Sequence, residues 1–430
     1  MRPIIPWRSR AAVWLLVPGL LGVVAYSVQF ADETTVAGYW PAAMAGSAIY
    51  LVFSCGVAAT AGAWEGKRFR AAAPVIASSS RSSAAVVTDH LWTPLAAGLL
   101  LQLVAVALMS RDTWGAPGGP SPLVGLAFAG ILFFHSCIGF ALGRWLPPVV
   151  SIPLSLLVSY SWLGFTWSVD YFPLRYLAGL VMADCCSVET ALDTRAPVIA
   201  TAFSLLAGCS LLVIAVARRS SGDRARRYGL QIGASSFVVI TLVALTAGSG
   251  LGAAPIVDRP QAQAICSGAA PTICLFPEQR DSGKSESVIR KAAENLGRSG
   301  ITVPSTIRAS NSPSTPDVLN MIVQVRMTDA DVLHSITTSL LGDAEVAYCG
   351  TEEDDAERRN DAAVANRWLI EVAAEGIVNA DHVEPALELD DPDVLRALRR
   401  APVPAQAAWV TATIDRLTDC SVGHITVPSS

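Results

Sequence analysis

Residues 230–252 read LQIGASSFVVITLVALTAGSGLG, a run without a charged side chain. An α-helix needs about 20 apolar residues to cross the hydrocarbon core of a bilayer, so this run predicts a membrane span. The basic segment ARRSSGDRARRYG, residues 217–229, comes directly before it and is a strong stop-transfer signal. The chain then continues to residue 430 with a more polar composition. The side of the membrane on which this span ends therefore decides where the second part of the protein lies.

The composition as a whole predicts a polytopic membrane protein. Hydrophobic residues make up 52% of the chain and charged residues only 16%, whereas about a quarter of a typical soluble domain is charged. We expect spans at about residues 11–30, 41–63, 91–109, 123–143, 149–167, 198–217 and 230–252. Arginines precede the first span, as in a signal peptide, but its full length and the spans that follow favour an uncleaved helix.

Positive charges set the expected orientation, because Lys and Arg concentrate in cytoplasmic loops. With the N-terminus inside, 13 basic residues fall on the inner side and only Arg111, Arg175 and Arg195 on the outer side. Seven crossings then leave the C-terminal part outside the cell. Arg outnumbers Lys 28 to 3, a bias typical of GC-rich bacterial genomes. We therefore expect a multi-pass protein of a bacterial plasma membrane.

Net charge divides the chain after the last span. Residues 1–253 hold 16 Lys and Arg against 10 Asp and Glu, whereas residues 254–430 hold 15 against 26. We expect a transmembrane domain at 1–253 and an extracytoplasmic domain at 254–430. Strand patterns in the second domain cover 272–277 and 318–327, and helical patterns cover 285–300, 329–342, 354–376, 391–400 and 404–420. The second domain is therefore predicted to be α+β and mostly helical.

Two polar residues lie near the middle of predicted spans. Gln102 falls in the third span and His135 in the fourth. Such residues are costly in hydrocarbon and tend to face other helices or a water-filled path. A hydrogen bond between helices is the simpler interpretation of either residue, and a role in transport is the alternative. The outer segment YFPLRYLAGLVM, residues 171–182, is apolar but too short to span, which favours a re-entrant or interfacial helix.

Cysteine positions agree with an oxidising outer side. Cys55, Cys137 and Cys209 fall in predicted spans, where free thiols pack as small apolar groups. The other six fall outside the cell and are disulfide candidates: Cys185, Cys186, Cys266, Cys274, Cys349 and Cys420. We expect Cys266 to pair with Cys274 and Cys349 with Cys420. The adjacent Cys185 and Cys186 are left open, since one of them could pair elsewhere.

The stretch Gly283-Lys284-Ser285 has the ending of a phosphate-binding loop. The full motif needs a glycine five residues before Gly283, and Glu278 stands there instead. We therefore interpret the stretch as a turn with Ser285 as the N-cap of a helix. The second domain also lacks H-E-x-x-H and G-x-S-x-G motifs. We expect no enzyme activity, cofactor, metal site or nucleic-acid partner in this chain.

Several of these features resemble ABC-2-type exporter permeases. They are the inside N-terminus, the basic inner segment after the second span, and the short element between the fifth and sixth spans. The segment GAWEGKRFRAAAP, residues 62–74, is similar to the loop that contacts the ATPase in ABC-2-like permeases of high-GC bacteria. ICLFPE, Cys349 and AQAAWVTATIDRLTDC look like the C-terminal domain of one branch of these proteins. The seventh span and the outer domain depart from a minimal six-span permease.

The resemblance implies a permease-like subunit, a homodimer or a heterodimer with another permease, that works with a separately encoded cytoplasmic ATPase. The exported substrate would be a natural product, a peptide or a lipid-like molecule. By this resemblance, the ATPase-facing candidates are Glu65, Lys67, Arg68 and Arg70. The basic segment also suits contact with anionic lipid headgroups. The alternative is a membrane-anchored module that binds or senses an external partner without transport.

Overall fold

A computed structural model gives the fold of the 430-residue chain. It describes all residues except 1–9, 35, 37, 73, 75, 77–81, 218–222, 281–283, 326, 343–351, 390, 420–424 and 429–430. The chain forms two compact units. The first comprises residues 1–187 and 191–257, and the second comprises residues 188–190 and 258–430. The boundary after the last long helix thus lies close to the expected one at 253, but a short piece of an earlier loop belongs to the second unit.

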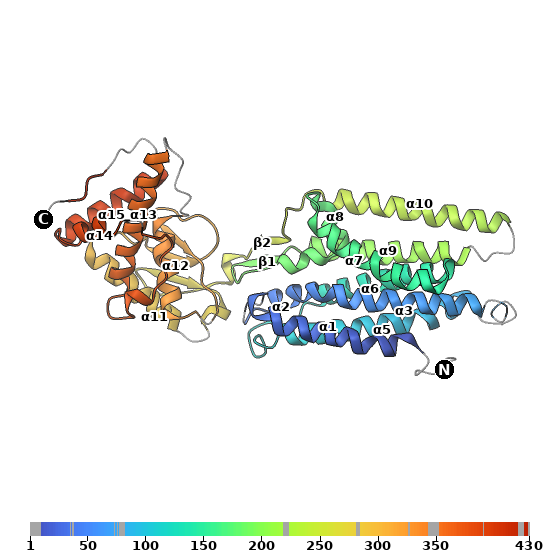
Figure 1. The fold of residues 1–430 in the computed structure, drawn as a ribbon. Coiled ribbons are helices and arrows are strands. Elements are labelled where there is room, and N and C mark those ends of the chain that lie inside the picture. Colours follow the sequence, from blue (N-terminus) through green and yellow to red (C-terminus); the bar gives the residue numbers. More distant parts are fainter. Residues whose placement is uncertain are drawn as a thin grey trace. The chain divides into compact units, whose positions relative to one another are not determined.

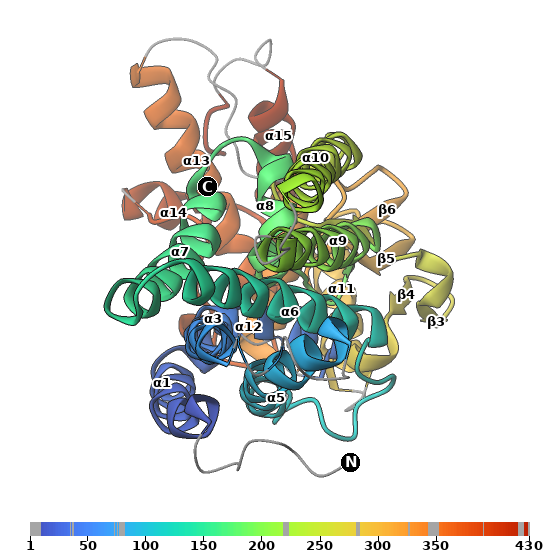
Figure 2. The same ribbon diagram turned by 90° about the vertical axis from the view of Figure 1, so that its right-hand side faces the viewer.

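The first unit is a helical bundle (Figure 1). Its elements are α1 (Ala11–Thr34), α2 (Trp40–Gly46), η2 (Ser47–Tyr50), α3 (Leu51–Ala71), α5 (Ser83–Met109), α6 (Pro122–Trp145), α7 (Pro148–Ser168), α8 (Phe172–Ala178), η3 (Leu180–Asp184), α9 (Arg195–Ala217) and α10 (Asp223–Gly248). Viewed along the helices, α3 lies between α1, α5, α6 and α7 (Figure 2), and it packs against each of them. The last helix, α10, packs against α8 and α9.

All seven expected spans correspond to helices that are long and apolar enough to cross a membrane. They are Ala11–Gln29, Trp40–Ala71, Ala84–Met109, Pro122–Trp145, Pro148–Ser168, Arg195–Ala217 and Arg226–Gly248. The second is longer than expected, because α2, η2 and α3 follow one another without a break and α3 continues to Ala71. The spans expected at 41–63 and 91–109 leave residues 64–90 as a loop, and this was wrong at both ends. Residues 64–71 form the last two turns of α3, and residues 83–90 belong to α5.

A close contact between α3 and α6 forms the centre of the bundle. Gly62 and Gly66 of α3 face Gly139 and Gly143 of α6, so each helix carries a G-x-x-x-G pair. A Cβ on Gly62 would lie 2.5 Å from the carbonyl oxygen of Ser136, and Cβ atoms on the other three would also collide with backbone carbonyls of the facing helix. Small residues allow membrane helices to approach closely. Glycine is therefore required on both sides of this contact.

The short apolar segment between the fifth and sixth spans forms two buried pieces, α8 and η3. Gly179 joins them with a φ of 80°, a left-handed conformation that favours glycine. Tyr176, Leu177, Leu180 and Val181 are almost completely buried, in contact with helices of the bundle. Backbone that is not part of a full span is tolerated at membrane depth only when protein covers it. The segment therefore forms short pieces packed against the bundle and no further long helix, as its length predicts.

The second unit is α+β, and helices make up most of it. Its strands are β3 (Ile265–Ser267), β4 (Thr272–Leu275), β5 (Thr306–Ala309) and β6 (Val318–Met321), in this order across one sheet. β3 pairs antiparallel with β4, whereas β4, β5 and β6 are parallel. The helices are α11 (Lys284–Ser299), α12 (Asp329–Leu341), α13 (Glu352–Ala373), α14 (Pro392–Leu398) and α15 (Val403–Thr418). A further pair of short strands, β1 (Thr190–Leu192) and β2 (Ile256–Asp258), forms a separate two-stranded sheet.

Two local expectations for the second unit need correction. Ser285 is not an N-cap, because α11 already begins at Lys284. The strand expected over 318–327 ends at Met321. The chain then turns into α12, which starts with a capping box in which the Thr328 and Asp331 side chains each accept from the other's backbone N–H.

The α3–α6 contact predicts a large difference between two glycines of the same helix. Gly139→Val should destabilise the bundle by about 1–3 kcal/mol or more, because the added atoms collide with the backbone of α3. Thermal unfolding of the purified protein in detergent measures the effect. Gly125→Val, also on α6, is the matched control, since a Cβ at Gly125 meets nothing within 4 Å. Equal stability of the two variants would contradict the proposed role of the contact.

Candidate functional site

The last turns of α3 carry a buried carboxylate. Glu65 is only 1% exposed. One of its oxygens lies 2.7 Å from Nδ1 of His90 on α5, and the other accepts a hydrogen bond from Arg68 at 3.3 Å. His90 is itself buried and stacks edge-on against Phe69. Burying a charge is unfavourable unless it is paired, so Glu65 holds the end of α3 and the start of α5 in one arrangement.

A buried arginine fixes the neighbouring end of α1. Arg10, directly before α1, is 1% exposed. Its guanidinium donates to the carbonyl oxygen of Asp89 at 2.8 Å and to the hydroxyl of Thr93 at 3.0 Å. It also lies 3.6 Å from the Asp89 carboxylate and 5.5 Å from the centre of the Trp92 ring. The start of α5 is thus tied both to α1 and to α3.

Two cations on the same end of α3 face outward. Lys67 lies over the Trp64 ring, with Nζ 4.7 Å from the ring centre, and Arg70 is exposed. Arg70 reaches the carbonyl oxygen of Arg144 at 3.5 Å, at the end of α6. Arg144 in turn lies 4.9 Å from the Phe69 ring and donates to the carbonyl of Ala215 on α9 at 2.5 Å. The ends of α3, α6 and α9 therefore meet around these cations.

The four candidates for an ATPase-facing surface divide accordingly. Arg70 is exposed, whereas Lys67 and Arg68 are partly exposed. Glu65 is buried, so its side chain is not part of an accessible surface. Glu65 instead holds the end of α3, the helix on which Lys67, Arg68 and Arg70 lie.

The two intramembrane polar candidates bond to other helices. Gln102 of α5 accepts from the Ser54 hydroxyl of α3 at 3.1 Å and donates to the Ser47 carbonyl at 2.8 Å. Nδ1 of His135 on α6 lies 2.7 Å from the Ser159 hydroxyl of α7. Both side chains are buried. Each thus joins two helices.

Two pairs of cysteines are within disulfide distance. Cys266 and Cys274 face each other across the β3–β4 hairpin, with Cα atoms 4.0 Å apart. The sulfur atoms of the adjacent Cys185 and Cys186 are also within bonding distance of each other. The expected pair Cys349 and Cys420 lies outside the described residues. Cys55, Cys137 and Cys209 are free thiols on helices of the bundle.

The loop residue Glu189 has its carboxylate buried in the core of the second unit. Glu189, in the connection between η3 and α9, is 2% exposed. One of its oxygens accepts from the Gln279 side chain at 2.8 Å and from the backbone N–H of Val323 at 3.2 Å. Its backbone carbonyl accepts from the N–H of Arg259 at 2.9 Å. Glu189 therefore lies where β4 and β6 have just ended, and it is a part of the fold of the second unit.

Charged side chains in and around the described part of the stretch that resembles a phosphate-binding loop pair with other residues of the fold. The Glu278 carboxylate is buried and forms two hydrogen bonds with Arg259, at 3.0 and 3.1 Å. Nζ of Lys284 lies 3.0 Å from the Asp329 carboxylate. The Ser267 hydroxyl, followed by Arg290 and Arg280, lowers the pKa of Glu286, so this carboxylate is charged at neutral pH. These pairings explain the charged residues of the stretch without a nucleotide.

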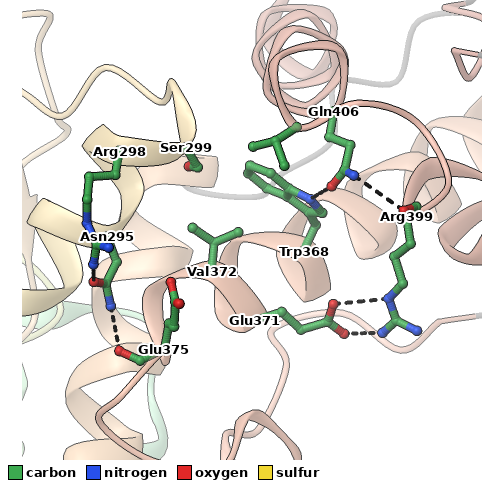
Figure 3. A pocket seen from close by; sticks show the side chains of 10 residues that line it. Asn295, Arg298, Ser299, Trp368, Glu371, Val372, Glu375, Arg399 and Gln406 are labelled. Atoms are coloured by element: carbon green, nitrogen blue, oxygen red, sulfur yellow. Dashed lines mark hydrogen bonds and ion pairs between the residues drawn. The ribbon is translucent and has the colours of Figure 1, made fainter.

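One pocket of the second unit lies between α11, α13 and α15 and measures ≈ 380 Å³ (Figure 3). Its polar side chains bond to one another. The Trp368 indole donates to Gln406 at 2.5 Å, Arg399 pairs with Glu371, and Asn295 donates to the carbonyl of Glu375 at 2.8 Å. These contacts hold the helices together, and they leave the pocket with few polar groups turned toward a ligand.

A second pocket, of ≈ 580 Å³, lies at the carboxyl ends of β5 and β6 and along one face of α12. Its described lining contains no Asp, Glu, Lys or Arg, and it is rich in hydroxyl and amide groups, among them Ser310, Ser312, Ser314, Asn320 and Thr338. Ligands of α/β folds commonly bind outside the carboxyl ends of parallel strands. This pocket is therefore the better candidate for a binding site in the second unit.

The roles of several of these residues were not predicted from the sequence. The G-x-x-x-G pairs of α3 and α6 were visible as GAWEG and GFALG, so their spacing could have indicated the close contact. Glu189 and His90 gave no such signal. A single Glu in a loop and a single His at the edge of a span acquire their roles only through partners far away in the chain.

The Glu189 contacts predict a specific pattern of destabilisation. Glu189→Leu leaves the Val323 N–H buried without its acceptor and should cost about 1–3 kcal/mol. Glu189→Gln keeps an acceptor oxygen at the same place and should cost less. Hydrogen exchange of the Val323 amide and thermal unfolding measure the two effects. Equal losses in both variants would show that the hydrogen bonds to Glu189 do not matter as described.

Comparison with known proteins gives one match. Residues 273–420 match a family described as a domain of unknown function (DUF7224). The matched range lies entirely within the second unit. No curated protein and no solved structure matches the chain.

Proposed function

We propose that this chain is the permease-like subunit of an ABC-type exporter. It lies in a bacterial plasma membrane with its N-terminus inside and its second unit outside the cell. ATP is bound and hydrolysed by a separately encoded cytoplasmic subunit. The substrate is a natural product, a peptide or a lipid-like molecule, and the chain pairs with a second permease, identical or related.

The observation that carries this proposal is the construction of the inner end of α3. The helix at the centre of the bundle continues into turns that expose Arg70 and leave Lys67 partly exposed. The same turns are held from behind by the buried Glu65 and its partner His90. A surface that receives force from a partner has to be exposed on one side and rigidly connected on the other. This end of α3 meets both conditions.

The packing supports transmission of a movement from this surface. A displacement of α3 reaches α6 through the glycine contact, because two backbones in direct contact cannot move independently. It reaches α5 through the Glu65–His90 pair. The buried elements α8 and η3, between the fifth and sixth spans, add support through their likeness to the corresponding element of ABC-2-type permeases.

A second candidate function is a membrane-anchored binding or sensing module without transport. The neutral pocket at the carboxyl ends of β5 and β6 favours it, since it offers a ligand many hydrogen-bonding groups. The two candidates differ at α3. A pure anchor needs no partner at the inner end of this helix, whereas an exporter subunit does.

Charge reversal at the exposed turns of α3 tests the exporter proposal. The double variant K67E/R70E should lose co-purification of an ATP-binding subunit by at least about tenfold, because like charges then face the partner. Arg68 is left unchanged, since it pairs with the buried Glu65. The measurement is quantitative mass spectrometry of the tagged protein isolated from its native membrane.

The matched control is R224E/R227E, which reverses two exposed arginines at the start of α10. It changes the total charge by the same amount and should retain the ATP-binding subunit. If K67E/R70E keeps its partner at the wild-type level, or if no ATP-binding protein accompanies the wild type, the proposal fails.

A further inference from the structure

The helix α7 has an unusual buried face. Its fully buried residues are Ser151, Ser155, Ser159, Leu163 and Thr166, which recur at helical spacing along one side. The apolar side chains of the helix point the other way: Leu157 is 60% exposed and Phe165 71%. The face toward lipid is thus apolar, and the face toward α3 and α6 is a line of hydroxyl groups. We call this line, together with His135, the hydroxyl seam.

Small hydroxyl residues are common between membrane helices and do not by themselves indicate a path. A second observation comes from His135, which lies halfway along α6 and is 0% exposed. Its Nδ1 contacts Ser159, but its Nε2 has no hydrogen-bond partner among the described residues. The Ser151 hydroxyl, also 0% exposed, lacks a partner there as well. Buried polar groups without partners are destabilising, and water usually satisfies them.

The chemistry of the hydroxyl seam is neutral. The sequence of α7 contains no Asp, Glu, Lys or Arg, α6 contains only Arg144, at its end, and α3 has charged residues only in its last two turns, from Glu65 on. Serine hydroxyls and a histidine can both donate and accept hydrogen bonds. Such a lining suits water and neutral hydroxyl or amide groups, and it offers no counter-charge to an ion.

An aromatic cluster lies next to His135 and one turn beyond Ser159 on α7. Trp162 of α7 stacks on Phe203 of α9 with ring centres 6.0 Å apart, and Phe134 contacts both rings edge-on. Leu163, on the seam itself, is completely buried beside them. The polar part of the seam thus reaches to the middle of α7 and is closed there by bulky apolar side chains.

We propose that the hydroxyl seam between α7 and the bundle is hydrated and binds the neutral hydrogen-bonding groups of the transported molecule. The assignment of a transported molecule rests on the proposed exporter function. A substrate with hydroxyl or amide groups fits this arrangement, because those groups would bond to Ser155, Ser159 and His135.

Cysteine accessibility tests the proposal without knowledge of the substrate. The free thiols Cys55, Cys137 and Cys209 are first replaced by Ala in the full-length chain. Ser155→Cys and Ser159→Cys are then introduced singly, since Ser and Cys differ little in size. Membrane vesicles are treated on both faces with a charged, membrane-impermeant methanethiosulfonate, and the rate of modification is measured.

The matched control is Leu157→Cys, on the lipid-facing side of the same helix at the same depth. Only a thiolate reacts, and it does not form in hydrocarbon. We expect modification at Ser155→Cys and Ser159→Cys at least about tenfold faster than at Leu157→Cys, the ratio that corresponds to about 1.4 kcal/mol. Adding His135→Leu to Ser155→Cys should slow the reaction, because it removes a polar group that holds water.

Two results would overturn the proposal: no modification of the seam cysteines, or equal rates at all three positions. Neither depends on the ATP-binding partner, because the vesicles need contain only this chain. If the seam cysteines do not react but an ATP-binding subunit still co-purifies, the hydrated seam is refuted and the exporter function is not. If the seam cysteines react but no ATP-binding subunit co-purifies, the exporter function is refuted and the seam is still hydrated.

Discussion

The direct backbone contact between α3 and α6 is the constraint on which the rest of the bundle depends. Four glycines, two on each helix, bring backbones so close that a single Cβ would collide. In lipid, the hydrophobic effect does not drive helices together, so close packing and hydrogen bonds between helices have to supply the stability. With α3 and α6 fixed to one another, α1, α5, α7 and α9 pack on this pair, and the hydrogen bonds of Gln102 and His135 secure α5 and α7.

The same contact gives the charged end of α3 its importance. Glu65 and Gly66 are neighbours, as are Gly143 and Arg144, so the Glu65–His90 contact and the Arg144 hydrogen bond begin where the glycine contact ends. Exposed cations, a buried carboxylate and a backbone contact follow one another along two turns of one helix. In the proposed exporter, this sequence of features is what transmits a load on the surface to the α3–α6 pair. In the second unit, Glu189 has a comparable position, since it fixes a loop segment in a core that is otherwise formed by residues after 257.

Bilayer thickness made the seven spans readable from sequence, because each needs a long uncharged run. The end of α3 was misjudged for a related reason. The charges in WEGKRFR indicate where an apolar span ends, but the helix continues beyond that point. The buried Glu65 is paired there with His90, 25 residues later in the chain. The hairpin of Cys266 and Cys274 is a local arrangement and could be anticipated, whereas the burial of Glu189 depends on Gln279 and Val323, which local patterns do not reveal. The line of serines on α7 was readable as a spacing, but its facing partner on α6 was not.

The central claim is that the exposed turns of α3 contact an ATP-binding subunit. Photo-crosslinking tests it most directly, with a benzophenone attached to a cysteine at position 67 and, as the reference, at position 157 on the lipid-facing side of α7. The account predicts that position 67 yields a crosslink to a protein with a nucleotide-binding site and that position 157 yields crosslinks to lipid alone. If position 67 crosslinks only to lipid or to other parts of this chain, the end of α3 does not receive force from an ATPase.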